Sequence, residues 1–190
     1  MFYKLLAQKI GKYTLDSICY EDENSAIFKA SSRKTEEVAA VKLLTINNLS
    51  RLKGKDSVIR FFDFLGKIRD VHHPNITKVY GYGKFYSFLW IASEWLEGLS
   101  LKTLLQKNNY IDFSTALALI LVCLQALDEL YSNGLIHGNL KPGNIWLTNK
   151  INRTKLLDPG LGANIYDVNI EKSRQAIKVI KANFLIFMFI

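Results

Sequence analysis

The sequence has few cysteines, few prolines and no secretory leader pattern. Its only two cysteines, Cys19 and Cys123, stand far apart among 190 residues and in no metal-ligand spacing. This pattern excludes a disulfide framework and a cysteine zinc site, and it favours a reducing compartment. The first residues lack the apolar core and small-residue cleavage site of a signal peptide. We therefore expect a cytoplasmic protein.

Long apolar runs and runs of one charge sign are also missing. The two most apolar segments, residues 116–127 and 183–190, fall well short of the ~20 residues that a membrane helix needs. Lys and Arg exceed Asp and Glu by 25 − 17 = 8, but the lysines are scattered singly. Such spacing is typical of a solvated surface, so we expect no membrane span and no clear nucleic-acid binding.

Five β-strands and one helix are predicted for the first half of the chain. Residues 11–30 alternate between polar and apolar and break at an acidic turn, which indicates a hairpin. Residues 38–44 predict a third strand, and residues 76–96 predict two more around a turn. Apolar residues at helical spacing predict a helix over 55–71, which ends before Pro74.

Helices dominate the predicted second half. Residues 99–106 form a short predicted helix, and a long one runs from a cap at Asp112 or Ser114 to Asn133-Gly134. A further helix is predicted over 168–182. Because strands and helices segregate along the chain, the fold class is α+β with two lobes.

Five short motifs, in order along the chain, resemble those of the protein kinase superfamily. They are "AAVK" ending at Lys42, "HHPNI", "SEWLEGLSL" starting at Ser93, "HGNLKPGN" and "LDPG". The resemblance implies a kinase-like two-lobe fold with a complete N-lobe and hinge over 1–96, made of a five-stranded antiparallel sheet and one helix. A truncated helical C-lobe over 97–178 and an apolar tail over 179–190 follow.

The resemblance also assigns residues to a nucleotide site that takes ATP and Mg²⁺. Lys42 is the phosphate-gripping lysine of the family. The hinge residues Glu94 and Leu96 offer backbone groups to the adenine. Asn144 and Asp158 hold magnesium, although both residue types also form ordinary turns. Lys141, two residues after the base position, is similar to that of the Ser/Thr branch.

Several family positions carry a residue that cannot do the family's chemistry. Asn139 stands where a catalytic aspartate is expected, and an amide has no usable basicity; the base contributes about 10²–10⁴-fold to the rate. The three glycines of the phosphate loop are replaced by Tyr20, Asp22 and Ser25. The acids in this stretch would oppose a triphosphate, unless the stretch is simply an acidic hairpin turn.

The partners of the surviving residues are also changed. Phe64 stands where a glutamate pairs with the lysine, so we expect Lys42 to lack a partner or to take another acid; alternatively it is a half-buried strand lysine. Gly138 replaces the arginine that clasps a phosphorylated activation loop. Pro159 replaces a packing phenylalanine and is expected to push Asp158 into an extended conformation.

The phosphate and metal binders therefore survive, whereas the residues for catalysis, closure and switching are lost. This division favours a pseudokinase that acts as a binding or scaffold module for a protein partner, with weak or no ATP and Mg²⁺ binding. A weakly active Ser/Thr protein kinase and a truncated, non-functional remnant are the alternatives. For the apolar end we favour truncation over a fragment of a larger protein or a minimal form whose tail covers the lobe.

Overall fold

The structure is a computed structural model that describes residues 2–46, 55–108 and 110–159. The helix predicted over 168–182 and the apolar tail lie outside the described residues. The chain forms two compact units, Met1–Arg69 with Lys78–Leu96, and Asp70–Thr77 with Glu97–Ile190. We describe each unit by itself.

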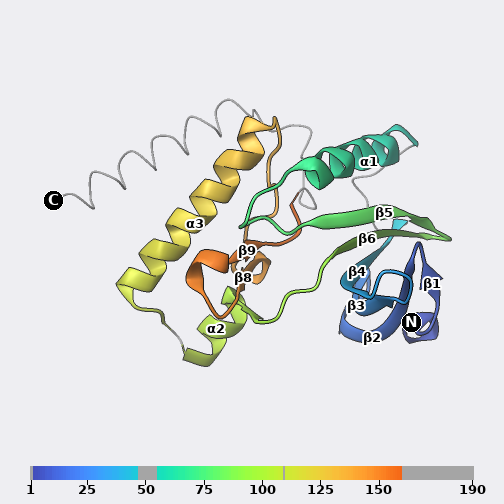
Figure 1. Cartoon of the computed structure of the whole chain (residues 1–190), viewed down its shortest axis with the longest axis horizontal. Helices are drawn as coiled ribbons and strands as arrows, with labels where there is room; N and C mark the ends of the chain where they lie inside the picture. The colour runs from blue at the N-terminus through green and yellow to red at the C-terminus, as the bar shows by residue number, and fades with distance from the viewer. Residues whose placement is uncertain (1, 47–54, 109, 160–190) are drawn as a thin grey trace. The chain divides into compact units, whose positions relative to one another are not determined.

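The first unit contains a six-stranded antiparallel sheet with the strand order β1-β2-β3-β4-β6-β5 (Figure 1). The five strands predicted from the sequence are confirmed, and they are joined by a two-residue strand that the sequence did not reveal. The strands are β1 (Lys9–Ile10), β2 (Tyr13–Glu21), β3 (Ser25–Ser32), β4 (Glu37–Thr45), β5 (Val79–Phe85) and β6 (Phe88–Glu94).

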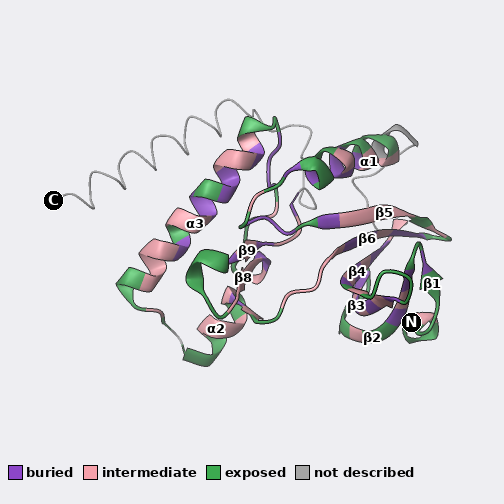
Figure 2. Cartoon of the chain, in the orientation of Figure 1, coloured by how far each residue is buried: buried purple, intermediate pink, exposed green. Residues whose placement is uncertain are grey.

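Side chains of β4 point alternately to opposite faces of the sheet. Ala39, Val41 and Leu43 are fully buried and belong to one apolar core cluster with Phe28 of β3 (Figure 2). Successive side chains of a strand point to opposite faces, so Lys42 lies on the other face of β4. The sheet thus holds this lysine away from the apolar core.

Helix α1 (Lys55–Asp70) completes the first unit and confirms the predicted helix. Its inward-facing side chains recur at helical spacing: Phe61, Phe64, Leu65 and Ile68 are all buried. The helix ends four residues before Pro74, as the disfavoured α conformation before a proline predicts.

The second unit combines helices with a small three-stranded sheet of order β7-β8-β9. The sequence predicted a helix from residue 99, but Leu99–Ser100 forms β7 and the helix starts two residues later. The sheet was not predicted, because strands of two or three residues carry no readable alternation. The elements are β7 (Leu99–Ser100), α2 (Leu101–Asn108), α3 (Phe113–Ser132), β8 (Ile145–Leu147) and β9 (Lys155–Leu156), with 3-10 turns at Pro142–Asn144 and Ile151–Arg153.

Helix α3 is the long predicted helix, and Asp112 is its N-cap. The Asp112 carboxylate accepts a hydrogen bond from Thr115 N at 2.9 Å, and hydrogen bonds from Ser114 and Thr115 hold the pKa of Asp112 well below its usual range. The helix is longer than the apolar segment 116–127. The helix has 20 residues, and an 18-residue stretch of it has a mean hydropathy of 1.7, so by length and composition alone it could cross a membrane. The core helix of a soluble protein can meet the same criterion of length and hydropathy. Of this 18-residue stretch, 39% is buried inside the structure.

Residues 70–77 belong to the second unit although they precede the last two strands of the first. Asn75 Nδ2 donates to Asn152 O and Thr154 O, each at 2.8 Å. Thr77 donates to Leu156 O from its backbone N at 3.0 Å and from its hydroxyl at 2.8 Å. These bonds hold the segment to β9, so the first unit is not the continuous stretch 1–96.

Candidate functional site

Lys42 is placed by β4, which is paired on both sides. It lies opposite Ile27 of β3 and Ile91 of β6, and its side chain is half-buried. Lys42 has an interaction partner in the structure. We expected Lys42 either to lack a partner or to take another acid, and the first of these expectations is therefore wrong.

Helix α1 presents an aromatic ring at the position where the resemblance expects a carboxylate. Phe64 is 7% exposed and lies in the buried row of the helix. The neighbouring acid, Asp63, is exposed, since one residue is about 100° around a helix. The buried face of α1 therefore carries no acid at this position.

The β2–β3 turn is organised around the carboxylate of Asp22. Its Oδ1 accepts from Asn24 N at 2.8 Å and from Ser25 N at 2.7 Å. Its Oδ2 accepts from the Tyr20 hydroxyl at 3.0 Å and from Ser25 Oγ at 3.1 Å. Burial alone would raise the pKa of Asp22, but these hydrogen bonds together lower it. The geometry is that of an Asp-closed hairpin turn.

Two further contacts fix this turn from outside. Thr45 donates to Asn24 O from its backbone N at 2.9 Å and from Oγ1 at 2.6 Å. Phe2 N donates to Glu21 Oε1 at 3.1 Å. Among the residues that the structure describes, Glu23 makes no such contact. Two of the three consecutive acids are thus used within the first unit itself.

The hinge residues follow the end of β6. Glu94 N donates to Lys78 O at 3.0 Å, and Glu94 Oε1 accepts from Lys78 N at 2.8 Å. Next along the chain, the Trp95 ring lies 4.9 Å from Lys29 Nζ. The Glu94 side chain is thereby engaged with the start of β5, while Leu96 ends the first unit.

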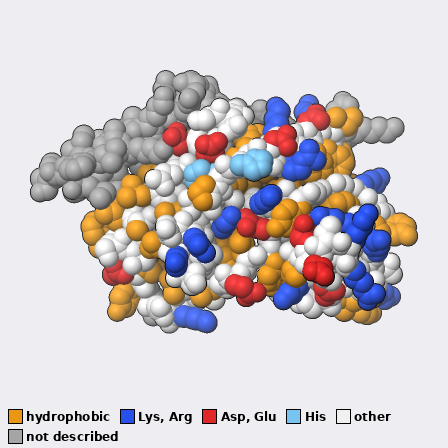
Figure 3. All heavy atoms as spheres, viewed as in Figure 1, with side chains coloured by type: hydrophobic (Ala, Val, Ile, Leu, Met, Phe, Trp, Pro, Cys, Tyr) orange, Lys and Arg blue, Asp and Glu red, His pale blue; other side chains and the backbone are white. Residues whose placement is uncertain are grey.

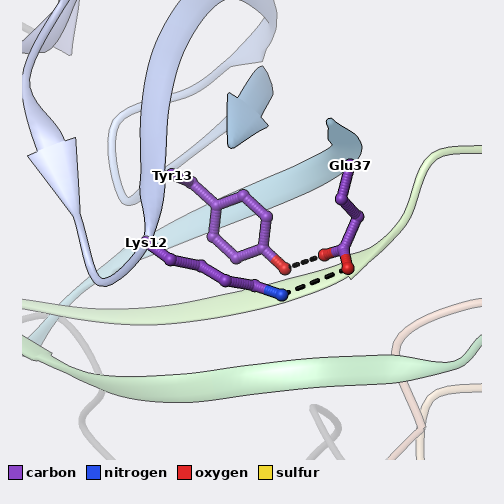
Figure 4. Close-up of polar contacts among 3 residues, drawn as sticks. All are labelled: Lys12, Tyr13 and Glu37. Carbon is purple, nitrogen blue, oxygen red and sulfur yellow. Dashed lines mark hydrogen bonds and ion pairs between the residues drawn. The ribbon is translucent and has the colours of Figure 1, made fainter. Parts of the chain in front are cut away.

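A second polar cluster in the first unit was not predicted from the sequence (Figure 4). The Tyr13 hydroxyl donates to Glu37 Oε1, and Lys12 Nζ lies 3.1 Å from Glu37 Oε2. Burial, followed by the Glu37 carboxylate, raises the pKa of Tyr13. The cluster joins the start of β2 to the start of β4. No local signal reveals it, because 24 residues separate Tyr13 from Glu37.

In the second unit, His137 supports the loop that precedes β8. The imidazole is 1% exposed, and its Nδ1 accepts from Asn139 N at 3.2 Å. Burial lowers the pKa of His137 to about 4, against the opposing effect of the Asp158 charge. His137 is therefore neutral at pH 7, and it holds the loop rather than carrying a charge.

The same loop brings Asn139, Lys141 and Asn144 together. Asn144 Nδ2 donates to Asn139 O at 2.8 Å, and Asn144 N donates to Lys141 O at 2.8 Å. Leu157 N in turn donates to Asn144 O at 2.8 Å. Asn144 is 6% exposed, whereas the Lys141 side chain is exposed. The chain just before Asp158 is thus held to this loop.

The backbone of Asp158 differs from the expectation. Its φ is +53°, a left-handed conformation, and not the extended one that Pro159 favours. The Leu157–Asn144 hydrogen bond and the burial of Pro159 constrain both neighbours, and aspartate tolerates this region better than most residues. Tertiary contacts therefore outweigh the local preference set by the proline.

The chemistry of Asn144 and Asp158 fits magnesium. Carboxylate and amide oxygens are hard ligands, and magnesium takes few protein ligands besides phosphate oxygens and water. Within the described residues, no donor bonds to Asn144 Oδ1. The same residues contain no group of three or more His, Cys, Asp or Glu suited to a metal ion. The Nδ2 bond also supports the alternative of a turn-forming asparagine, and the two roles are compatible.

The sequence profile of the protein kinase domain matches residues 21–178, and the chain belongs to this family. It is similar to a probable serine/threonine-protein kinase of Dictyostelium discoideum, 31% identical over 157 residues, which cover 83% of this chain and 31% of the relative. It is also similar to the probable serine/threonine-protein kinase PknB of Lactococcus lactis, 27% identical over 73% of this chain and 21% of that protein. The chain thus spans about a third or less of these relatives.

Solved kinase structures share the fold. The PknI kinase domain of Mycobacterium tuberculosis matches with a TM-score of 0.74 and 20% identity, over 90% of this chain and 73% of that one. This likeness confirms the predicted α+β, two-lobe kinase-like fold.

Proposed function

We propose that the chain is a catalytically impaired pseudokinase that serves as a binding or scaffold module, with weak or no ATP binding. The observation that carries the proposal is the turn closed by Asp22. A phosphate-binding loop works by directing backbone N–H groups at the ligand. Here the N–H groups of Asn24 and Ser25 donate to a carboxylate of the same turn.

Charge at the turn opposes a nucleotide as well. Two like charges ~5 Å apart repel by roughly 3 kcal/mol at an effective dielectric near 20. A phosphate brought to this turn would face Asp22 and the exposed Glu23. The phosphate would therefore have to displace the Asp22 carboxylate before it could accept hydrogen bonds from the N–H groups of Asn24 and Ser25.

The residues for phosphoryl transfer point the same way. Asn139 supplies an amide where a base is needed, and Phe64 supplies a buried ring where an ion pair is needed.

Figure 3 shows Lys and Arg side chains interspersed with acids on the visible face, which supports a protein partner over a nucleic acid. We place the protein in the cytoplasm, without a membrane span.

A thermal-shift series with ATP and Mg²⁺ tests the nucleotide part. A ligand at 100 times its Kd stabilises the folded state by about 2.7 kcal/mol. We expect little or no shift at millimolar ATP. A large shift that Lys42→Met abolishes would contradict weak binding, whereas a shift of equal size in Lys42→Met would show that ATP binds elsewhere.

A weakly active Ser/Thr protein kinase, transferring the ATP γ-phosphate to protein, is the second candidate. Asn144 favours it, because its Oδ1 receives no hydrogen bond from the described residues, and relatives carry the name serine/threonine-protein kinase. Radiolabel transfer to a generic protein substrate that Asp158→Ala abolishes would support this candidate. Silence at high protein concentration would exclude it. The third candidate, a remnant without function, would show no cooperative unfolding.

A further inference from the structure

We infer that the N-terminal arm, residues 2–8, is a strap that fixes the position of the β2–β3 turn. The arm folds back on the first unit and contacts both ends of β2. Its state thereby controls how freely the turn moves. The consequence for nucleotide rests on the proposed function, but the strap itself does not.

The far end of the arm is anchored in the apolar core. Phe2, in the 3-10 turn Phe2–Leu5, is 1% exposed and belongs to the core cluster of the sheet. Its ring centroid lies 5.4 Å from that of Phe88, at the start of β6. An aromatic side chain buried to this extent is a strong apolar anchor.

Hydrogen bonds attach the arm to the two ends of β2. At the start, Ala7 N donates to Leu15 O at 2.8 Å, and Leu15 N donates to Gln8 O at 3.0 Å. At the end, Phe2 N donates to Glu21 Oε1 at 3.1 Å across 19 residues. The arm therefore runs alongside β2 and ends at the residue where the turn begins.

The backbone of the arm is held against its local preference. Ala7 has a φ of +63°, a left-handed conformation that alanine disfavours. The conformation persists because the Phe2 anchor and the bonds to β2 impose it. An arm held to the sheet by a few tertiary contacts can open locally before the whole unit unfolds.

Release of the arm removes one of three anchors of the turn. The Asp22 network and the Thr45 bonds to Asn24 remain, but Glu21 loses its backbone donor. The turn then moves more, because one of the contacts that fix its first residue is gone. A docked arm holds the turn in its closed, self-bonded form.

Amide hydrogen exchange on the full chain without nucleotide tests the strap. The reporters are the turn amides of Asp22, Asn24 and Ser25. In Glu21→Ala we expect their exchange to accelerate by roughly fivefold, the size of one ordinary hydrogen bond in an opening equilibrium. Phe2→Ala should accelerate them at least as much. Glu23→Ala, with the same charge change in the same turn, should leave them unchanged.

Equal exchange in Glu21→Ala, Glu23→Ala and the unaltered chain overturns the strap. Exchange of Val41 and Leu43 in the centre of β4 separates local release from unfolding of the whole unit in Phe2→Ala. If the β4 amides in Phe2→Ala accelerate as much as the turn amides, the whole unit has been destabilised. The test of the strap then rests on Glu21→Ala alone. Because no nucleotide is present, failure of the strap leaves the ATP thermal-shift result unaffected, and the reverse also holds.

Discussion

At the scale of single residues, Asp22 shows how one carboxylate alters a loop. A glycine at this position would leave the neighbouring N–H groups open, whereas Asp22 accepts from Asn24 N and Ser25 N and also binds two hydroxyls. Side-chain closure of a turn is favourable for aspartate because its oxygens reach the amides two and three residues on. The same oxygens place negative charge at the turn that the resemblance to the family assigns to phosphate binding.

Acid should weaken this turn. Because folding lowers the pKa of Asp22 below its ordinary value of 3.8, the stability that depends on its carboxylate is complete above that value. It is lost as the pH falls through the lower, folded value. In Asp22→Asn we expect the unfolding free energy at pH 7 to drop by about 1 kcal/mol and its fall between pH 5 and 2 to become shallower. Urea unfolding measures both.

Glu23→Gln is the matched control for that substitution. It removes the same charge from the same turn but, within the described residues, breaks no hydrogen bond. A pH dependence in Glu23→Gln that is shallower by the same amount would attribute the effect to net charge and contradict the role given to Asp22.

At the scale of elements, helix α1 carries a buried apolar row, and Phe64 is part of it. Truncation of a buried Phe leaves a cavity and loses transfer free energy. Phe64→Ala should therefore lower the unfolding free energy by about 3 kcal/mol. Chemical denaturation followed by circular dichroism measures this loss.

Ile59 on the same helix provides the control, since it is 57% exposed. Ile59→Ala should change the unfolding free energy by no more than about 0.5 kcal/mol. Similar losses for the two substitutions would mean that α1 does not pack through the row containing Phe64.

At the scale of the whole molecule, the chain crosses between its two units more than once. Asn75 is 4% exposed, and its side-chain amide satisfies two carbonyls of the second unit. Asn75→Ala removes both bonds and takes this donor away from the carbonyl of buried Thr154. We therefore expect the unfolding free energy to fall by about 2 kcal/mol, with cooperativity retained. Urea unfolding tests this, with the exposed Asn149→Ala as control. Gradual, non-cooperative unfolding of the unaltered chain would instead favour the third candidate, a remnant without function.

Much of the fold was predictable because it rests on local pattern. The alternation of β2 to β6 and the 3.6-residue spacing of α1 are visible in a single stretch of sequence. The strands β1, β7 and β9 have two residues each, too short for any period. The Tyr13–Glu37 bond and the Asn75 bonds join residues 24 and 77 or more positions apart, and no window of sequence contains both partners.

The sequence by itself determined the family and the chemical identity of each site residue, including an amide at Asn139 and an aromatic ring at Phe64. Those are properties of single letters and of motif order. Only the tertiary structure decided that Asp22 closes its own turn, that Asp158 has a left-handed backbone and that Phe2 reaches Glu21. Hydrogen bonds and backbone conformations of this kind depend on which distant segments meet, and that is settled by packing rather than by local preference.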